Sequence, residues 1–75
     1  MLKKSHKMHL SELILELKKR RETLNVTQEQ LADISGVGLR TLKQFESGKG
    51  NPTLQTLYKL ADTLGLKLKL EVKEI

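Results

Sequence analysis

Residues 27–47 read TQEQLADISGVGLRTLKQFES, and this stretch decides the fold of the chain. Thr27 is a favourable N-cap, and Gln30 three residues later completes a capping box, so a helix is predicted to begin here. Gly36 is predicted to end that helix, because glycine readily takes the left-handed conformation found just after helix C-termini. A second helix is predicted to begin near Gly38 and to run to the end of the stretch. The pattern therefore predicts two short helices joined by a tight glycine turn.

Apolar residues within this stretch indicate which sides of the two helices are buried. Leu31 and Ile34 lie three apart and are predicted to share the inner face of the first helix. Leu42 and Phe45 have the same spacing on the second helix, and Val37 is expected to fill the turn. The polar and basic residues left on the outer face of the second helix are Arg40, Thr41, Lys43 and Gln44. Two helices, a glycine turn and an outer face that can reach a nucleic acid are typical of a DNA-binding helix-turn-helix.

The composition describes a small, basic domain. With 75 residues the chain has room for one domain, and a domain of this size buries only about 60% of the surface of its unfolded chain, so association with a second copy would help. The net charge of +5 and the pI of about 9.7 favour a polyanionic partner. One Phe, one Tyr and no Trp argue against a protein that binds single strands by stacking bases on aromatic rings.

Other classes of function lack the residues that they need. The absence of cysteine excludes disulfides and Cys-ligated zinc, and His6 and His9 have no further ligands, so no metal site is predicted. There is no Ser-His-Asp set and no glycine-rich phosphate loop, so neither an enzyme nor a cofactor is expected. No apolar run approaches the roughly 18 residues of a membrane span, and the basic first residues lack the apolar core of a secretory signal. We therefore expect a cytoplasmic protein.

The chain before residue 27 predicts one amphipathic helix. Its apolar residues follow the i, i+3, i+4, i+7 pattern and are Leu10, Leu13, Ile14 and Leu17. Ser11 is predicted as its cap, and the pattern continues to about Leu24. The basic residues of its C-terminal half are Lys18, Lys19, Arg20 and Arg21. The helix dipole favours cations there, and all of them except Arg21 are expected to face solvent.

A fourth helix is predicted after the loop GKGNP. Pro52 cannot continue a helix, and Thr53 is well placed as the next N-cap. The apolar stripe of this helix consists of Leu54, Leu57, Leu60, Ala61 and Leu64. Gly65 is expected to end it.

Residues 66–72 read LKLKLEV and alternate between apolar and charged residues with a period of two, which predicts a half-buried strand. Its apolar face consists of Leu66, Leu68, Leu70 and Val72. A lone strand leaves its backbone donors and acceptors unpaired, so the simplest partner is the same strand of a second copy. An extended tail with chance alternation is the alternative.

The chain is thereby divided into three parts. Residues 1–9 are basic and aperiodic, and form either a frayed, flexible tail or an arm that contacts the minor groove or phosphates. Residues 10–65 are the predicted DNA-binding domain, and residues 66–75 are the predicted dimerisation strand.

The stretch TQEQLADISGVGLRTLKQFESGKGNPTLQTLYKLADTLGL resembles the Cro/C1-type (XRE) helix-turn-helix domain of phage repressors and many small bacterial regulators. The resemblance covers roughly residues 10–65, with TQEQLA, the GV turn, FESGKGNP and TLxxLxxLAxxLG in register. It implies a mainly α, four-helix domain. The small size and the strand after LGL look like HipB-type antitoxins, and imply a C-terminal β-strand that pairs across a dimer.

The resemblance also implies a function. HipB-type proteins are homodimers that repress their own operon and bind a HipA-type kinase toxin. Because a dimer presents two recognition helices to successive major grooves, the operator in double-stranded DNA is expected to be an inverted repeat. A phage-type repressor or a restriction-modification controller protein without a toxin partner is the alternative. A protein whose main work is to inhibit a toxin, with DNA binding secondary, is a further possibility.

Roles for individual residues follow from the matching positions. The residues at base-reading positions are Leu39, Arg40, Lys43 and Gln44, and those at phosphate-contacting positions are Gln28, Thr41, Lys49 and Asn51. Each also has a plainer interpretation, since Gln28 could be an ordinary helix residue and Arg40 and Lys43 could supply only diffuse charge. The sequence departs from the family at Gly38, where Ser or Thr is usual, and at Leu39, where a polar residue is usual. Leu39 suits either a thymine methyl group or local packing.

Glu46 is an acidic residue on a helix that is predicted to bind DNA. If it pointed outward it would repel phosphate, so it is predicted to point inward toward Arg21, its structural partner in the family. We assign this ion pair to the scaffold.

Overall fold

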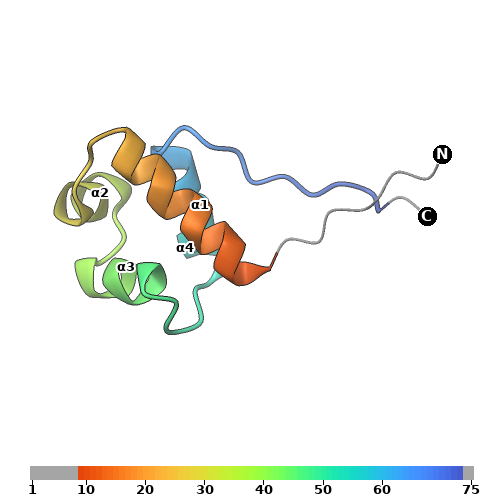
Figure 1. The fold of residues 1–75 in the computed structure, drawn as a ribbon, viewed down its shortest axis with the longest axis horizontal. Helices are drawn as coiled ribbons and strands as arrows, with labels where there is room; N and C mark the ends of the chain where they lie inside the picture. Colours follow the sequence, from red (N-terminus) through yellow and green to blue (C-terminus); the bar gives the residue numbers. More distant parts are fainter. Residues whose placement is uncertain (1–8, 74–75) are drawn as a thin grey trace.

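The computed structural model describes residues 9–73, and within them the chain forms four α-helices (Figure 1). They are α1 (Leu10–Thr23), α2 (Gln28–Ser35), α3 (Leu39–Glu46) and α4 (Leu54–Thr63). Helix α2 packs against both α3 and α4, and α1 packs against α3. The prediction of a mainly α, four-helix domain is confirmed. None of the helices described is long and apolar enough to cross a membrane.

Local sequence signals explain where α2 and α4 begin. The Thr27 hydroxyl accepts a hydrogen bond from the backbone N–H of Gln30 at 3.0 Å, and the Gln30 side chain accepts from the Thr27 N–H at 2.9 Å. Thr53 caps α4 in the same way, because its hydroxyl accepts from the N–H of Thr56. Gly36 has φ of +77° at the end of α2, as the predicted turn requires. Both ends of α2 and the beginning of α4 therefore lie within a residue of the expected positions.

The core lies where all four helices meet. Its buried residues are Ile14, Leu17, Leu31, Val37, Leu42, Phe45, Leu60, Ala61 and Leu64. Three of them, Leu31, Leu42 and Leu60, are fully enclosed. Burying a side chain of this size contributes about 1.5–3 kcal/mol relative to leaving it in water. Because α2, α3 and α4 each contribute one of the three, the core fixes their positions relative to one another.

Ile34 was predicted to be buried beside Leu31, and this prediction is wrong, because the side chain is 69% exposed. Ile34 lies about 60° to one side of Leu31 around the helix axis. The partly buried residues of α2, which are Gln28, Ala32 and Ser35, lie on the opposite side of Leu31. The buried arc of α2 therefore extends away from Ile34.

Two expectations about helix beginnings are also wrong. Helix α1 begins before Ser11, with His9 at the N-cap position and no side-chain cap. Leu10 and Leu54, assigned to buried stripes, are 48% and 75% exposed. Each is the first residue of its helix, at the edge of the bundle, where no neighbouring helix covers it.

The predicted C-terminal strand is not formed within the part of the chain that the structure describes. Leu66 packs against the core, and its N–H donates to the carbonyl of Ala61 at 2.8 Å. Residues 67–73 then run away from the helical body (Figure 1) with no secondary structure. Leu70 and Val72 are 101% and 95% exposed. A strand exists only with a hydrogen-bonded neighbour, and residues 9–66 offer this segment none. The tail predicted for residues 1–9 lies outside the described residues apart from His9.

Candidate nucleic-acid interface

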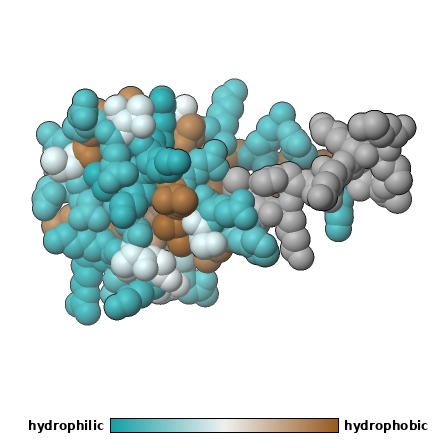
Figure 2. Space-filling view, viewed as in Figure 1, coloured by the Kyte–Doolittle hydropathy of each residue, from teal (hydrophilic) through white to brown (hydrophobic). Residues whose placement is uncertain are grey.

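Helix α3 is held by its inner face and presents its outer face to solvent. Leu42 and Phe45 are 0% and 2% exposed, so the rotation of the helix about its axis is fixed. The side chains that consequently face outward are Arg40, Thr41, Lys43 and Gln44, all of them exposed. Figure 2 shows that the visible face of the helical body is mostly hydrophilic, with a smaller hydrophobic area near its middle. An exposed basic helix on a fixed scaffold is the arrangement with which helix-turn-helix proteins enter a major groove.

The start of α3 carries the two departures from the family pattern. Gly38 occupies the N-cap position with no side-chain cap, and a Cβ there would meet only the hydroxyl of Thr41 at 3.8 Å. A serine would therefore fit, and the glycine is not required by space. Leu39 is partly buried rather than fully exposed. Its placement is compatible with both interpretations given above, packing and contact with a base.

Four of the predicted contact residues surround one depression. It has a volume of about 90 Å³ and is lined by Thr41, Gln44, Phe45, Lys49, Gly50, Asn51 and Pro52. The loop after α3 is folded back onto the helix, because the N–H of Lys49 donates to the carbonyl of Gln44 at 2.9 Å. Gly48 and Gly50 make this possible with φ of +80° and +81°. The loop thus brings Lys49 and Asn51 to the end of α3, whereas Arg40 and Lys43 stand apart from the depression.

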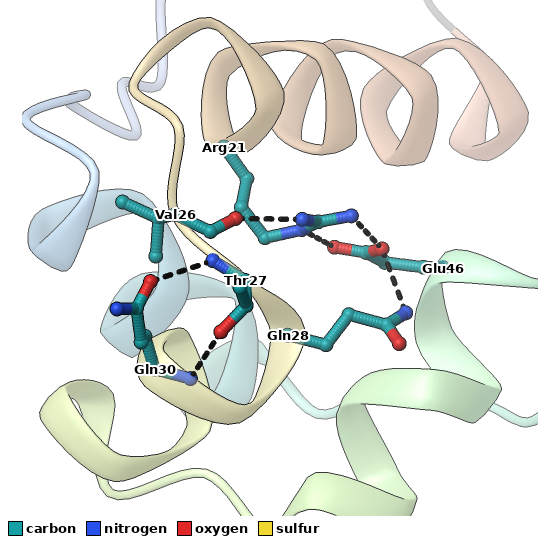
Figure 3. A network of polar contacts seen from close by, with 6 residues as sticks. All are labelled: Arg21, Val26, Thr27, Gln28, Gln30 and Glu46. Carbon is teal, nitrogen blue, oxygen red and sulfur yellow. Dashed lines mark hydrogen bonds and ion pairs between the residues drawn. The ribbon is translucent and has the colours of Figure 1, made fainter.

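Arg21 and Glu46 contact each other beneath α3 (Figure 3). The Arg21 Nε lies 2.7 Å from Glu46 Oε2, and Nη2 donates to Oε1 at 2.9 Å, so the pair is bidentate. The two side chains are only 11% and 4% exposed. Hydrogen bonding to Glu46 raises the pKa of Arg21 above its already high usual value, against the opposing effect of burial. The pair ties α1 to α3.

Two contacts of this network had no signal in the sequence. The Nη1 of Arg21 donates to the carbonyl of Val26 at 2.7 Å, which fixes the turn between α1 and α2. The Nε2 of Gln28 donates to Glu46 Oε1 at 3.0 Å (Figure 3). Gln28, assigned to a phosphate contact, is thus partly committed to the scaffold. Its amide nitrogen has a second N–H, so one donor remains for a ligand.

No group of three or more His, Cys, Asp or Glu side chains in residues 9–73 could hold a metal ion. The exposed side chains of the interface, among them Arg40, Lys43 and Lys49, supply hydrogen-bond donors and positive charge. Such groups bind phosphates and the acceptor-rich edges of bases.

Comparisons with known proteins agree with this geometry. A family model described as helix-turn-helix matches residues 17–70, and the chain belongs to this XRE-type helix-turn-helix family. The cryptic phage CTXphi transcriptional repressor RstR of Vibrio cholerae is 42% identical over 52 residues, which are 69% of this chain and 46% of RstR. An uncharacterised helix-turn-helix-type transcriptional regulator of Haemophilus influenzae is 41% identical over 58 residues, or 77% of this chain and 59% of that protein. The chain thus spans about half the length of these curated relatives.

A solved structure matches nearly the whole chain. It is described as a complex of HipB, carrying one serine-to-alanine substitution, with an O2 20mer, and its HipB chain superposes with a TM-score of 0.79 at 26% sequence identity. The match covers 96% of this chain and 100% of that one. The relatives named above are described as a transcriptional repressor and a transcriptional regulator.

Proposed function

We propose that this chain is a sequence-specific repressor of double-stranded DNA that reads its operator with α3. The observation that carries the proposal is the division of α3 into a fully buried apolar face and an exposed basic one. We assign base reading to Leu39, Arg40, Lys43 and Gln44, and phosphate contacts to Gln28, Thr41, Lys49 and Asn51. A long cation such as Arg40 can donate two hydrogen bonds to guanine O6 and N7.

The test is selection of binding sites from a random double-stranded library, followed by fluorescence anisotropy at fixed salt. We expect an inverted repeat with half-sites about 10 bp apart, or a multiple of that, because two recognition helices must enter successive major grooves. The selected DNA should bind at least about 10³-fold more tightly than a scrambled duplex of equal length. Equal affinity for both would show binding without sequence specificity and contradict the proposal.

We further propose that residues 66–72 pair antiparallel with their two-fold mate and make the chain a homodimer. The apolar face of this segment leaves the core at Leu66 and continues through Leu68 to the uncovered Leu70 and Val72. Two-fold symmetry allows one segment to supply both strands. Covering these side chains would contribute several kcal/mol per chain, at about 1.5–3 kcal/mol each, before the entropy of ordering is subtracted.

Truncation tests this dimer. The cut belongs after Leu66, because that residue packs against the core of its own chain. The truncated chain should be monomeric by analytical ultracentrifugation and should bind a single half-site weakly. If it remains dimeric and binds the palindrome as tightly as the full chain, the residues after Leu66 do not hold the dimer together.

Within the repressor function, we propose an antitoxin that represses its own operon in the bacterial cytoplasm and binds a HipA-type kinase toxin. The likeness to HipB over nearly the whole of both chains supports this assignment. A phage-type repressor or a restriction-modification controller protein without a toxin partner is the alternative, and the similarity to RstR favours the phage-type repressor of these two. Coexpression with the product of the neighbouring gene distinguishes the antitoxin from a repressor without a toxin partner. A stable complex with a kinase supports the antitoxin, and a neighbour that does not bind favours the alternative.

A further inference from the structure

The junction between α4 and the C-terminal segment has a defined geometry. Gly65 takes φ of +75°, its N–H donates to the carbonyl of Asp62, and the N–H of Leu66 donates to the carbonyl of Ala61. These two bonds form the Schellman ending of a helix, which turns the chain sharply out of the helical path. Leu66 then packs against the core. The chain is therefore anchored up to residue 66, and residues 67–73 project from that anchor.

Arg20 ties this junction to a different helix. Its Nε donates to the carbonyl of Leu64 at 3.0 Å, across 44 positions of sequence. A Cβ built on Gly65 would lie 3.5 Å from its Nη2, so the guanidinium lies against the turn itself. A cation at this place also suits the negative end of the α4 dipole. Arg20 was expected to face solvent with its basic neighbours, and this expectation is wrong. Only Arg21 was singled out from the sequence, and it holds α3 instead.

We infer that Arg20 is a positioning residue for assembly of the DNA-binding dimer, because it sets the direction in which residues 67–73 leave the body. This inference rests on the proposed pairing of that segment across the two-fold axis. Residues 67–73 make no backbone hydrogen bond among the described residues, so the junction at their base has a large part in fixing their direction. Seven extended residues reach about 23 Å, and a rotation of about 12° at the base would move the tip by about 5 Å, which is the spacing of neighbouring strands. A loose junction would therefore lose the register of the pair and the separation of the two recognition helices.

The absence of cysteine from the chain allows a direct measurement. Spin labels on Glu16→Cys and Lys69→Cys, both at exposed positions, report the distance between α1 and the segment by pulsed electron resonance. Labelled chains are diluted with unlabelled ones so that the distance within one chain dominates. Arg20→Met keeps the apolar stem of the side chain and removes its donors, and we expect it to broaden the distance distribution. Lys19→Met makes the same change at an exposed neighbouring position and should leave the width unchanged. Arg20→Lys restores a donor and should restore the narrow distribution.

The second measurement is dimerisation of the same unlabelled variants by analytical ultracentrifugation. We expect Arg20→Met to raise the dimer dissociation constant at least fivefold, with circular dichroism unchanged and Lys19→Met equal to the parent. If Arg20→Met does not fold, Arg20→Leu, which also lacks a side-chain donor, takes its place. A parent chain that is monomeric overturns the proposed dimer, whatever Arg20 does. A dimeric parent whose Arg20→Met variant matches it in distance width or in dissociation constant overturns the role of Arg20 alone.

Discussion

The helical body and the C-terminal segment are both rich in leucine, yet among the described residues the fully enclosed leucines all belong to the body. In the body the apolar residues recur with the helical period, and Leu31, Leu42 and Leu60 are fully enclosed. In the segment they recur with a period of two, and Leu70 and Val72 are almost wholly exposed. A helix pairs its backbone groups within itself, whereas a strand needs a neighbour. The helical body therefore forms its structure within one chain, whereas the C-terminal segment lacks, within the part of the chain described, the neighbour that a strand needs.

The two parts also contain contrasting ion pairs, which give the largest expected effect. Arg21 and Glu46 are nearly buried, whereas Lys69 and Glu71 are 74% and 71% exposed at 3.3 Å. Glu46→Gln should lower the free energy of unfolding by about 3–5 kcal/mol, because it leaves a buried guanidinium without its counter-charge. Glu71→Gln, the matched control, should cost less than about 1 kcal/mol. Urea melts followed by circular dichroism measure both. If the two variants lose the same free energy of unfolding, the ion pair of the body is no more stabilising than the exposed pair of the segment.

Removing an uncovered leucine of the segment should affect assembly and not the fold of the body. If Leu70 is buried only in the dimer, Leu70→Ala loses part of about 1.5–3 kcal/mol per chain. Since a dimer contains two copies, the dissociation constant should rise at least about tenfold. Analytical ultracentrifugation measures it, with Lys67→Ala on the opposite side of the segment as the control. A dimer that tolerates Leu70→Ala as well as Lys67→Ala does not bury this face.

Local chemistry explains which features were predictable from the sequence. The Thr27 and Thr53 caps and the Gly36 turn act within four residues of themselves, so their signals could be found in the sequence. The hydrogen bonds of Arg20 to Leu64 and of Gln28 to Glu46 join positions 44 and 18 apart, which no periodicity links. The inward direction of Glu46 was predictable only because a carboxylate conflicts with a DNA-binding face.

Errors arose where periodicity alone was used to assign burial. The i, i+3 spacing of Leu31 and Ile34 is compatible with two different buried arcs of α2, and the positions of α3 and α4 select the one that excludes Ile34. The alternation in residues 66–72 predicted a half-buried strand that the described chain does not form, because a strand needs a hydrogen-bonded neighbour and a periodic pattern does not supply one. Local signals thus predicted the helices of the body, whereas burial and pairing depend on contacts between segments that are distant in the sequence.

Two basic residues of the body should separate base reading from phosphate binding. Arg40→Ala should cost about 1–3 kcal/mol of operator affinity and relax the preference at one base pair. Lys49→Ala should weaken binding to all sequences alike and reduce the slope of log K against log salt by about one unit. Fluorescence anisotropy over a salt series, on the selected operator and on single-base variants, measures both. Identical salt slopes with unchanged specificity in the two variants would contradict the assignment.

The smallest effect is expected at Ile34, where the body itself leaves a large apolar side chain uncovered. Because the side chain is 69% exposed, Ile34→Ala should change the free energy of unfolding by no more than about 0.5 kcal/mol. The better helix propensity of alanine offsets part of any lost contact. Leu31→Ala, three residues earlier on the same helix, should cost about 2.7–5 kcal/mol, since it opens a cavity in the core. Urea melts at two protein concentrations measure both variants. If Ile34→Ala costs more than about 1.5 kcal/mol, and more at the higher concentration, a second copy covers Ile34 and the body is as incomplete there as the C-terminal segment.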